Sequence, residues 1–389
     1  MNITFINAQF AGGRIGSLRI RGARIAALDV DPEAKDAVVD LDGGRLLPGL
    51  INAHDHLQLN SLPEHETPKF YRHARHWIAE VDARRHTDSQ FEAGASVARD
   101  ERLLFGGLKN LLSGVTTVAQ HDPLYPFLTQ AGYPISVVRE YGWSHSLYID
   151  GEQSVAESYR TTPAAWPWIV HAAEGQDQEA ANEFERLEAL GCLGPNTLLV
   201  HGIALDQAQR ARLEAAGSAL IWCPSSNMRL FGKTAQVADL VSKDRVALGT
   251  DSRLSGARDL LDELRVAANL SAMDEDALEG LVTEVSATLL HLPDRGALRP
   301  GLRADLLVLP AGTSLRDTTR SAVRLVMIDG IARYGDAECV MRASTGAEWN
   351  RVLVDGVPKM LDGSLARLLA CAPLSEPGLE IARLTGRAA

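Results

Sequence analysis

From residue 46 onward the chain alternates short apolar runs with amphipathic stretches, and this pattern constrains its fold more than any other feature. Seven apolar runs have the length and β-branched content of buried strands: residues 46–51, 114–120, 134–142, 166–175, 197–206, 218–227 and 245–252. The stretches between them, such as DQEAANEFERLEALG, begin with Asp and end with Gly as helices do. This alternation predicts an α/β fold with a parallel sheet, and eight such strands close into a TIM barrel.

The fourth barrel strand has the weakest sequence signal. It has to lie within residues 143–165, a short stretch for a strand and a helix, and we place it at SLYID, residues 146–150. The predicted fold is therefore a (β/α)8 TIM-like barrel whose fourth strand is either SLYID or degenerate.

Both ends of the chain are rich in short β-type segments with turn residues between them. Residues 1–45 contain ITFINAQF, and residues 300–345 contain RADLLVLP and SAVRLVMIDGIARYG. We predict that these two regions form one small β-sandwich domain beside a barrel domain at residues 46–299. Residues 346–389 contain LARLLACAPLSEPGLEIARL and are predicted to form a C-terminal helical tail.

The composition excludes several classes of function. A net charge of −11 and a pI near 5.5 argue against a general nucleic-acid binder, which needs a basic face. The four cysteines include no C-x-x-C pair, so neither a disulfide framework nor a thiolate zinc site is expected. The sequence shows no signal peptide and no apolar run long enough to span a membrane, which predicts a cytoplasmic protein.

Residues that can bind a metal ion follow several of the predicted strands. His54 and His56 follow the first strand, and His171, His201 and Asp251 end later ones. A single such histidine is more often a structural residue, and a single Asp can simply cap the next helix. Because the carboxyl ends of barrel strands meet at one face, their joint occurrence predicts a metal site there.

The chemistry of this set is that of hydrolysis. Three histidines and a carboxylate form an open catalytic site, in which nitrogen and oxygen donors suit zinc and also ferrous iron. Such a metal lowers the pKa of bound water from about 15.7 to about 7. We expect Asp251 to bind the metal and take the water proton, Glu174 to act as general acid, and His201 to polarise the substrate or hold the attacking hydroxide.

In this order, seven motifs between about residue 40 and residue 310 resemble the amidohydrolase superfamily of metal-dependent TIM-barrel hydrolases. They are PGLINAHDHL, SGVTTVAQHD, HAAE, VHGIALD, CPSSNMRL, GTDS and GALRPGLRADLLVL. The closest resemblance is to the branch of cytosine, guanine, 8-oxoguanine and S-adenosylhomocysteine deaminases and triazine chlorohydrolases. The resemblance implies that His54, His56, His171 and Asp251 bind the metal, and that Glu174 and His201 act in proton transfer and transition-state binding.

We expect one metal ion. Relatives with two metals often use a carboxylated lysine at the fourth strand, and no lysine occurs between Lys109 and Lys233, although Glu140 is an alternative bridge. Four further histidines crowd the region after the first strand, where we expect a solvated, partly helical lid in preference to a second metal site: His65, His73, His76 and His86.

His121 follows the second strand, and similar tracts in 8-oxoguanine and triazine enzymes face the substrate, so we predict a substrate contact there. Five more residues lie near predicted loop mouths and are candidates to line the pocket, with packing as the alternative role: Gln58, Trp77, Tyr125, Trp143 and Asn227.

The predicted function is hydrolytic deamination of a small amino-substituted nitrogen heterocycle by metal-bound hydroxide. The alternatives are hydrolysis of a cyclic amide or another non-peptide C–N bond, and loss of halide, by the same site. A more distant alternative is an inactive barrel that serves as a scaffold. The predicted partner is a small-molecule substrate, and the oligomeric state stays open, with a homo-oligomer among its alternatives.

Overall fold

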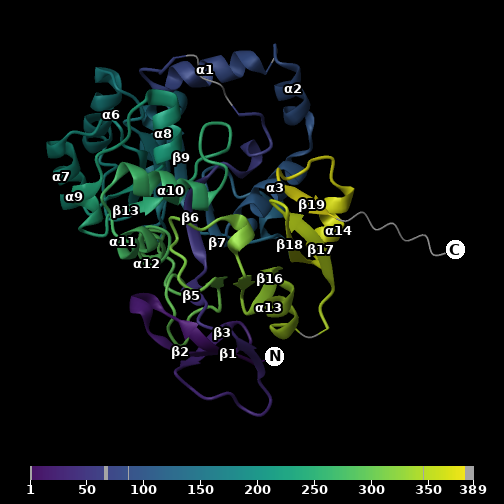
Figure 1. The fold of residues 1–389 in the computed structure, drawn as a ribbon. Helices are drawn as coiled ribbons and strands as arrows, with labels where there is room; N and C mark the ends of the chain where they lie inside the picture. Colours follow the sequence, from purple (N-terminus) through teal and green to yellow (C-terminus); the bar gives the residue numbers. More distant parts are fainter. Residues whose placement is uncertain (1, 65–68, 86, 345, 382–389) are drawn as a thin grey trace.

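The computed structural model describes residues 2–64, 69–85, 87–344 and 346–381. Its centre holds eight short strands, which lie in two sheets of three and five strands (Figure 1). The first sheet has the order β6 (Leu50–Asp55), β7 (Val115–Gln120) and β8 (Ser136–Val137). The second has the order β13 (Val246–Leu248), β12 (Ala219–Trp222), β11 (Thr197–His201), β10 (Trp168–Ala172) and β9 (Gly142–Ser146). Neighbouring strands are parallel in both sheets, as predicted.

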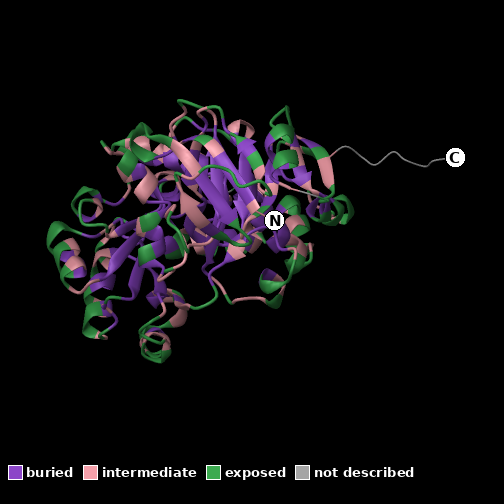
Figure 2. Cartoon of the chain, turned by 90° about the horizontal axis from the view of Figure 1, so that it is seen from below, coloured by how far each residue is buried: buried purple, intermediate pink, exposed green. Residues whose placement is uncertain are grey.

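The parallel strands are buried and the helices between them cover them, as Figure 2 shows by the purple strands inside a green and pink periphery. Both faces of such strands are covered, which explains why the sequence runs are continuously apolar. The main surrounding helices are α3 (Arg99–Leu112), α6 (Gln178–Ala189), α7 (Gln207–Ala215), α8 (Pro224–Phe231) and α10 (Leu260–Leu270). Asp177 caps α6 and Asp206 forms a capping box on α7, so the predicted Asp start signals are confirmed.

Five further helices and four 3-10 turns lie between these elements or in the outer sheet. They are α5 (Glu152–Thr161), α9 (Ala238–Val241), α11 (Glu275–Gly280), α12 (Glu284–Leu289) and α13 (Ala337–Arg342), with 3-10 turns η1 (Ala11–Gly13), η2 (Leu57–Leu59), η3 (Pro126–Thr129) and η4 (Arg320–Ala322). Within the described part of the chain, no helix has both the length and the apolar character needed to cross a membrane.

The predicted position of the fourth strand is wrong. The strand is β9, which pairs with β10 through Gly142 opposite Trp168, whereas SLYID contributes a single helical turn, α4 (Leu147–Asp150). The carboxylate of Asp150 accepts the backbone N–H of His145 at 2.6 Å, which turns the chain as soon as the strand ends. The strand GWSHS escaped prediction because it carries serines where an apolar run was expected.

The apolar run at residues 46–51 is also divided between two strands. Its first part is β5 (Arg45–Pro48), which belongs to the outer sheet, and its second part begins β6. The break falls at Gly49, where an added Cβ would lie 2.2 Å from the Thr116 side chain.

The two ends of the chain join in one mixed sheet of 11 strands, in which ten strands follow a single hydrogen-bonded path and β4 pairs with β1 beside that path. Its N-terminal members are β1 (Asn2–Gln9), β2 (Ile15–Arg21), β3 (Arg24–Leu28), β4 (Ala37–Asp40) and β5. The next members are β14 (Leu306–Leu309), β15 (Leu325–Ile328) and β16 (Ile331–Gly335). β5 pairs antiparallel with β14, with Leu47 opposite Leu307, and this pairing joins the two ends of the chain.

The prediction of a helical C-terminal tail is wrong for most of the described tail. β17 (Trp349–Val354) and β18 (Val357–Asp362) form a hairpin, β19 (Leu379–Ile381) pairs with β17, and α14 (Gly363–Cys371) is the helical part. The hairpin turn is Asp355-Gly356, and both residues have positive φ, 50° and 81°. Asp-Gly between two alternating runs is a strong hairpin signal, and it is present in the sequence.

A helical segment lies above the carboxyl ends of the parallel strands. It consists of α1 (Ala74–Arg84) and α2 (Ser89–Ser96), at the top of Figure 1. The expected helical character is present here, and its role as a lid stays a prediction; His76 is exposed, whereas His73 is buried at the start of α1 and so is not part of a solvated surface. His65 and His86 lie outside the described residues.

Candidate metal centre and active site

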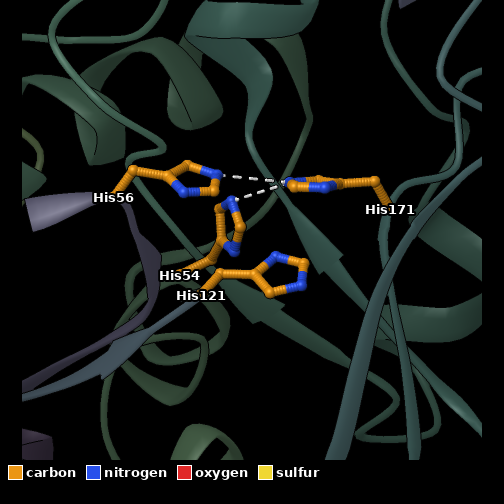
Figure 3. Close-up of side chains that lie close together, drawn as sticks. All are labelled: His54, His56, His121 and His171. Carbon is orange, nitrogen blue, oxygen red and sulfur yellow. Dashed lines mark hydrogen bonds between the residues drawn. The ribbon is translucent and has the colours of Figure 1, made fainter. Parts of the chain in front are cut away.

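Three of the predicted metal ligands converge from two strands. His54 lies in β6 with His56 just beyond it, and His171 lies in β10, on the other parallel sheet. Nε2 of His171 lies 3.4 Å from Nε2 of His54 and 3.4 Å from Nε2 of His56 (Figure 3). Residues two apart on a strand share a face, which is how one short motif directs both imidazoles to this point.

Hydrogen bonds at the opposite ring nitrogens fix two of these imidazoles. His171 Nδ1 donates to the carbonyl oxygen of His145 at 2.9 Å, and His56 Nδ1 donates to Asp122 Oδ2 at 2.8 Å. We assign these tautomers from the partners, because a carbonyl and a carboxylate only accept. In its neutral form each ring therefore keeps an Nε2 lone pair for the shared centre, the arrangement typical of metal-binding histidines.

The spacing of these nitrogens fits a divalent metal. With metal–nitrogen bonds of about 2.0–2.1 Å, the ligands of a tetrahedral site are about 3.3–3.4 Å apart. The two distances of 3.4 Å agree with this value. Asp251 Oδ1 lies slightly farther away, 3.9 Å from His54 Nε2 and 3.8 Å from His56 Nε2.

His121, predicted as a substrate contact, lies in the same cluster. His54, His56, His121 and His171 each offer a ring nitrogen, and these nitrogens all lie within 4.8 Å of one another. His121 Nε2 donates to the carbonyl oxygen of Ser144 at 2.9 Å. Its Nδ1 is buried and has no hydrogen-bond partner among the described residues, so it is free to accept.

Burial sets the protonation states of the cluster. Burial lowers the pKa of His54 and His171 well below the ordinary histidine value, and it lowers the pKa of His121 to about 3. Neutral imidazole is the form that binds a metal. For Asp251, burial raises the pKa, but the charges of His56 and His201 outweigh it and the pKa falls below the ordinary value.

Asp122 was not predicted, although it follows His121 directly in the sequence. Burial lowers the pKa of His56, but the hydrogen bond and charge of Asp122 overcome this effect and raise that pKa to about 9. Gln58 also donates to Asp122 Oδ2, at 2.6 Å. Asp122 thus orients His56, and Gln58 in turn holds Asp122.

Glu174 and His201 face each other across the cavity. Glu174 Oε1 lies 3.7 Å from His201 Nε2, and His201 Nδ1 lies 2.8 Å from Asn227 Oδ1, to which it donates. Trp77 and Tyr148 donate to the two oxygens of Glu174 at 3.4 and 3.5 Å. Burial raises the pKa of Glu174, which His201 opposes in part, so the carboxyl group holds a proton more firmly than usual.

Two of the site residues take strained backbone conformations. His201 has a φ of 77° and Asp251 has a φ of 52°, in the left-handed region that side chains other than glycine rarely adopt. Such strain concentrates at functional sites, where the surrounding structure holds it.

A cavity of about 230 Å³ opens onto these residues. His56, His171, Glu174, His201 and Asp251 line it, and so do Gln58, Asp122 and His145. Helix α1 supplies one wall through Trp77, Ile78, Val81, Asp82 and Arg85.

The other predicted pocket residues lie outside this lining. Asn227 supports His201 from behind, and Trp143 packs edge-on against the ring of His121 with centroids 5.8 Å apart. Tyr125 lies under the guanidinium of Arg99 at 4.4 Å. Glu140 is exposed, lies beyond the end of β8 and lines a different cavity, so its position favours no bridging role.

A parallel α/β fold that gathers buried histidines and a carboxylate at its strand ends defines a class of proteins, the metal-dependent hydrolases. Comparison with known proteins finds similarity to enzymes of this kind. A profile of the amidohydrolase family matches residues 168–337. Over these residues the chain is thus similar to the amidohydrolase family, and the curated relatives named below, which are deaminases, agree with the resemblance to the deaminases of that superfamily.

Among the curated relatives, a 5-methylthioadenosine/S-adenosylhomocysteine deaminase of Halobacterium salinarum is 27% identical over 72% of this chain and 76% of its own. An 8-oxoguanine deaminase of Pseudomonas aeruginosa is 25% identical over 91% of this chain and 93% of its own.

Two solved structures share the fold. An adenosine deaminase of Xanthomonas campestris with bound zinc has a TM-score of 0.68 at 18% identity and covers 89% of this chain and 94% of its own. An atrazine chlorohydrolase of Arthrobacter aurescens in complex with zinc has a TM-score of 0.66 at 17% identity, over 85% and 94%.

Proposed function

We propose that this protein is a metal-dependent hydrolase that deaminates a small amino-substituted nitrogen heterocycle. The observation that carries the proposal is that the buried side chains of Glu174 and His201 line one cavity together with His56, His171 and Asp251. The names of the relatives support a hydrolase that acts on carbon–nitrogen bonds, because they are deaminases.

His54, His56, His171 and Asp251 would hold one divalent metal ion. Zinc is the proposed ion, since two of the fold neighbours carry it, and ferrous iron is the alternative that the donor set accepts. When bound, the metal supplies Lewis-acid activation of water near neutral pH.

The protein's own residues move the protons. Asp251, with a lowered pKa, is ionised and accepts the proton of the attacking water at its carboxylate. Glu174, with a raised pKa, delivers its proton to a ring nitrogen and so prepares the amino group to leave as ammonia. His201, held by Asn227, contacts the substituent of the carbon under attack. The sum is replacement of C–NH2 by C=O with water consumed and ammonia released.

The size of the cavity favours a small substrate. Pockets for drug-sized ligands measure about 300–1,000 Å³. At about 230 Å³ this cavity lies below that range, so it suits a single or fused heterocycle without a large substituent. Cyclic-amide hydrolysis and loss of halide use the same groups and remain the alternatives.

The arrangement of the whole chain is also a proposal. We infer that the two parallel sheets form one closed barrel at residues 46–299, with residues 1–45 and 300–345 as the second domain. Asp251 N donates to the carbonyl oxygen of His54 at 3.1 Å, which supports closure between β13 and β6. A cytoplasmic location and a homo-oligomeric state stay predictions.

The test is a screen for ammonia release by the zinc-loaded protein. Amino-purines, amino-pyrimidines, pterins and amino-triazines are the candidate substrates, with cyclic amides and halogenated triazines beside them. We expect ammonia from at least one amino-heterocycle, and none after chelation of the metal. If only a cyclic amide or a halogenated triazine is hydrolysed, the protein catalyses one of the alternative reactions. Full activity after chelation would refute the metal-dependent mechanism.

A further inference from the structure

A buried polar network lies next to the histidine cluster, and none of its side chains had a predicted role. Its centre is Lys109 of α3, whose side chain is 1% exposed. Lysine is rarely buried so completely unless it is paired. Here its ammonium group lies 3.1 Å from Asp55 Oδ2, and Asp55 is the residue between His54 and His56.

Lys109 also reaches the strand that carries Asp251. Its Nζ donates to Thr250 Oγ1 at 3.0 Å and lies 3.4 Å from the carbonyl oxygen of Asp251. A further hydrogen bond of 2.8 Å goes to Asn60 Oδ1. One ammonium group therefore touches two of the three chain segments that supply the proposed ligands, the segments of His54 and His56 and of Asp251.

These contacts lie where the backbone ladder is missing. Among the described residues, β6 and β13 share no ladder pairs, and a single backbone hydrogen bond, from Asp251 N to the carbonyl oxygen of His54 at 3.1 Å, joins His54 of β6 to the segment that follows β13. Side chains bridge this seam: Asn52 donates to Thr250 Oγ1 at 2.9 Å and accepts the backbone N–H of Thr250 at 3.1 Å. Gly249 allows the close approach, since an added Cβ would lie 2.6 Å from the Cβ of His54.

The carboxylate of Asp55 is saturated by donors on every side. Lys109 and Asn110 both donate to Oδ2, at 3.1 and 2.9 Å, and Asn60 donates to Oδ1 at 2.8 Å. Both Asp55 and Lys109 lie outside the described lining of the cavity, so the pair does not touch the substrate. A fully satisfied buried network of this kind is rigid and specifies one geometry.

We propose that Lys109 is a positioning residue, which with Asp55 sets the separation of the His54 and His56 imidazoles from the carboxylate of Asp251, which follows β13. The inference rests on the proposed function, because it concerns the metal that those ligands would hold. The network takes the place of a backbone ladder at the seam, and the metal geometry depends on it.

The chain offers a matched control. Lys359 in β18 is also buried, and its Nζ donates to Asp336 Oδ1 at 2.6 Å and to the carbonyl oxygen of Val323 at 2.7 Å. It forms a comparable pair in the outer sheet, far from the histidine cluster in the topology. Lys359→Met therefore reports the cost of losing a buried lysine without disturbing the seam.

The experiment compares the full-length wild type with Lys109→Met, Lys359→Met and the double variant Asp55→Asn/Lys109→Met. The double variant removes both charges together, so it avoids the uncompensated carboxylate that can prevent Lys109→Met from folding. Cobalt(II) is the probe: chelator competition gives its affinity, and its visible absorption spectrum reports the ligand geometry. Thermal unfolding of the metal-free proteins measures stability separately.

We expect the double variant to fold with cobalt affinity reduced about 10–100-fold, the usual cost of losing groups that orient metal ligands, and with a changed absorption spectrum. Lys359→Met should lower the unfolding temperature and leave affinity and spectrum unchanged. Wild-type affinity and spectrum in the double variant would overturn the positioning role, and so would an equal loss of affinity in Lys359→Met. Failure of the wild type to bind cobalt would instead overturn the proposed function and the inference with it.

Discussion

The outer sheet and the mouth of the parallel strands both bury polar groups, but they satisfy them in different ways. Beside the outer sheet, Arg320 is 2% exposed and donates to the carboxylate of Glu376, so opposite charges balance in place. At the mouth, the Nε2 atoms of His54 and His56 both lie 3.4 Å from Nε2 of His171. Acceptors that face one another need a cation or protons between them. The first region is complete by itself, whereas the second is built for a ligand.

Removal of one mouth histidine should give the largest effect. In His171→Ala we expect metal content and ammonia release to fall to background. Losing a group that only orients a metal ligand lowers metal affinity roughly 10–100-fold, and losing the ligand itself should lower it further. Metal analysis and the ammonia assay measure both quantities.

A matched control for this variant is His291→Asn. His291 lies outside the cluster, donates to the carbonyl oxygen of Ala165 at 2.8 Å, and has a φ of 55° that asparagine tolerates. It should keep both metal and activity. Full metal content in His171→Ala would show that the mouth histidines do not hold the metal, so that the mouth would no longer differ from the outer sheet in requiring a ligand.

Glu174→Gln should separate chemistry from metal binding. The variant keeps the shape of the side chain but has no proton to give, so we expect turnover to fall about 10²–10⁴-fold with unchanged metal content. Burial raises the pKa of Glu174, so the protonated acid persists to higher pH than an ordinary glutamic acid. Wild-type turnover should therefore decline as pH rises through that pKa, and the residual turnover of Glu174→Gln should lack this decline. An unchanged rate would exclude Glu174 as the acid.

Asp122→Asn should have an intermediate effect on metal affinity. Asparagine still offers an oxygen to His56 Nδ1, but the negative charge that raises the pKa of His56 is gone. We expect the zinc dissociation constant to rise about 10–100-fold, measured by chelator competition.

Asp82→Asn is the control for this variant, since Asp82 also lines the cavity but pairs with Arg85. It should bind zinc as the wild type does. Equal affinities in all three proteins would show that Asp122 does not orient His56.

The sequence predicted the parts of this site that depend on strand geometry. His54, His56, His171 and Asp251 stand at strand ends, and the parallel topology is sufficient to bring such positions to one face. The structure brings them together, while their role as ligands stays a prediction.

Other parts of the molecule could not be predicted because their local sequence patterns are typical of structures other than the ones they form. Lys109 lies in an amphipathic helix, where a lysine normally faces water, and its burial depends on the distant partners Asp55 and Thr250. The strand GWSHS is polar at the positions where the pattern requires apolar residues. The hairpin at Asp355-Gly356, in contrast, had a clear local signal that the helical look of the following residues concealed.

Two buried carboxyl groups near the mouth, Asp251 and Glu263, have pKa values shifted in opposite directions, and they give the prediction with the smallest expected effect. The charges of nearby histidines lower the pKa of Asp251, whereas burial raises the pKa of Glu263 to about 8 from an ordinary value of 4.5. Glu263 Oε1 accepts the backbone N–H of Ser225 at 2.8 Å, and Oε2 is buried without a partner among the described residues. Burial therefore favours the neutral form of Glu263, in contrast to the ionised Asp251.

Because the pKa of Glu263 is raised in the folded state, its contribution to stability is full below about pH 4.5 and is lost as the pH rises through about 8. Glu263→Gln mimics the neutral carboxyl at every pH, so the variant should become progressively more stable than the wild type between pH 5 and pH 9, by roughly a few degrees in unfolding temperature. The difference between the two proteins at each pH isolates Glu263, since the mouth histidines titrate equally in both. If the unfolding temperatures of the wild type and Glu263→Gln change in parallel with pH, Glu263 is charged in the folded protein. Burial alone would then not distinguish Glu263 from Asp251.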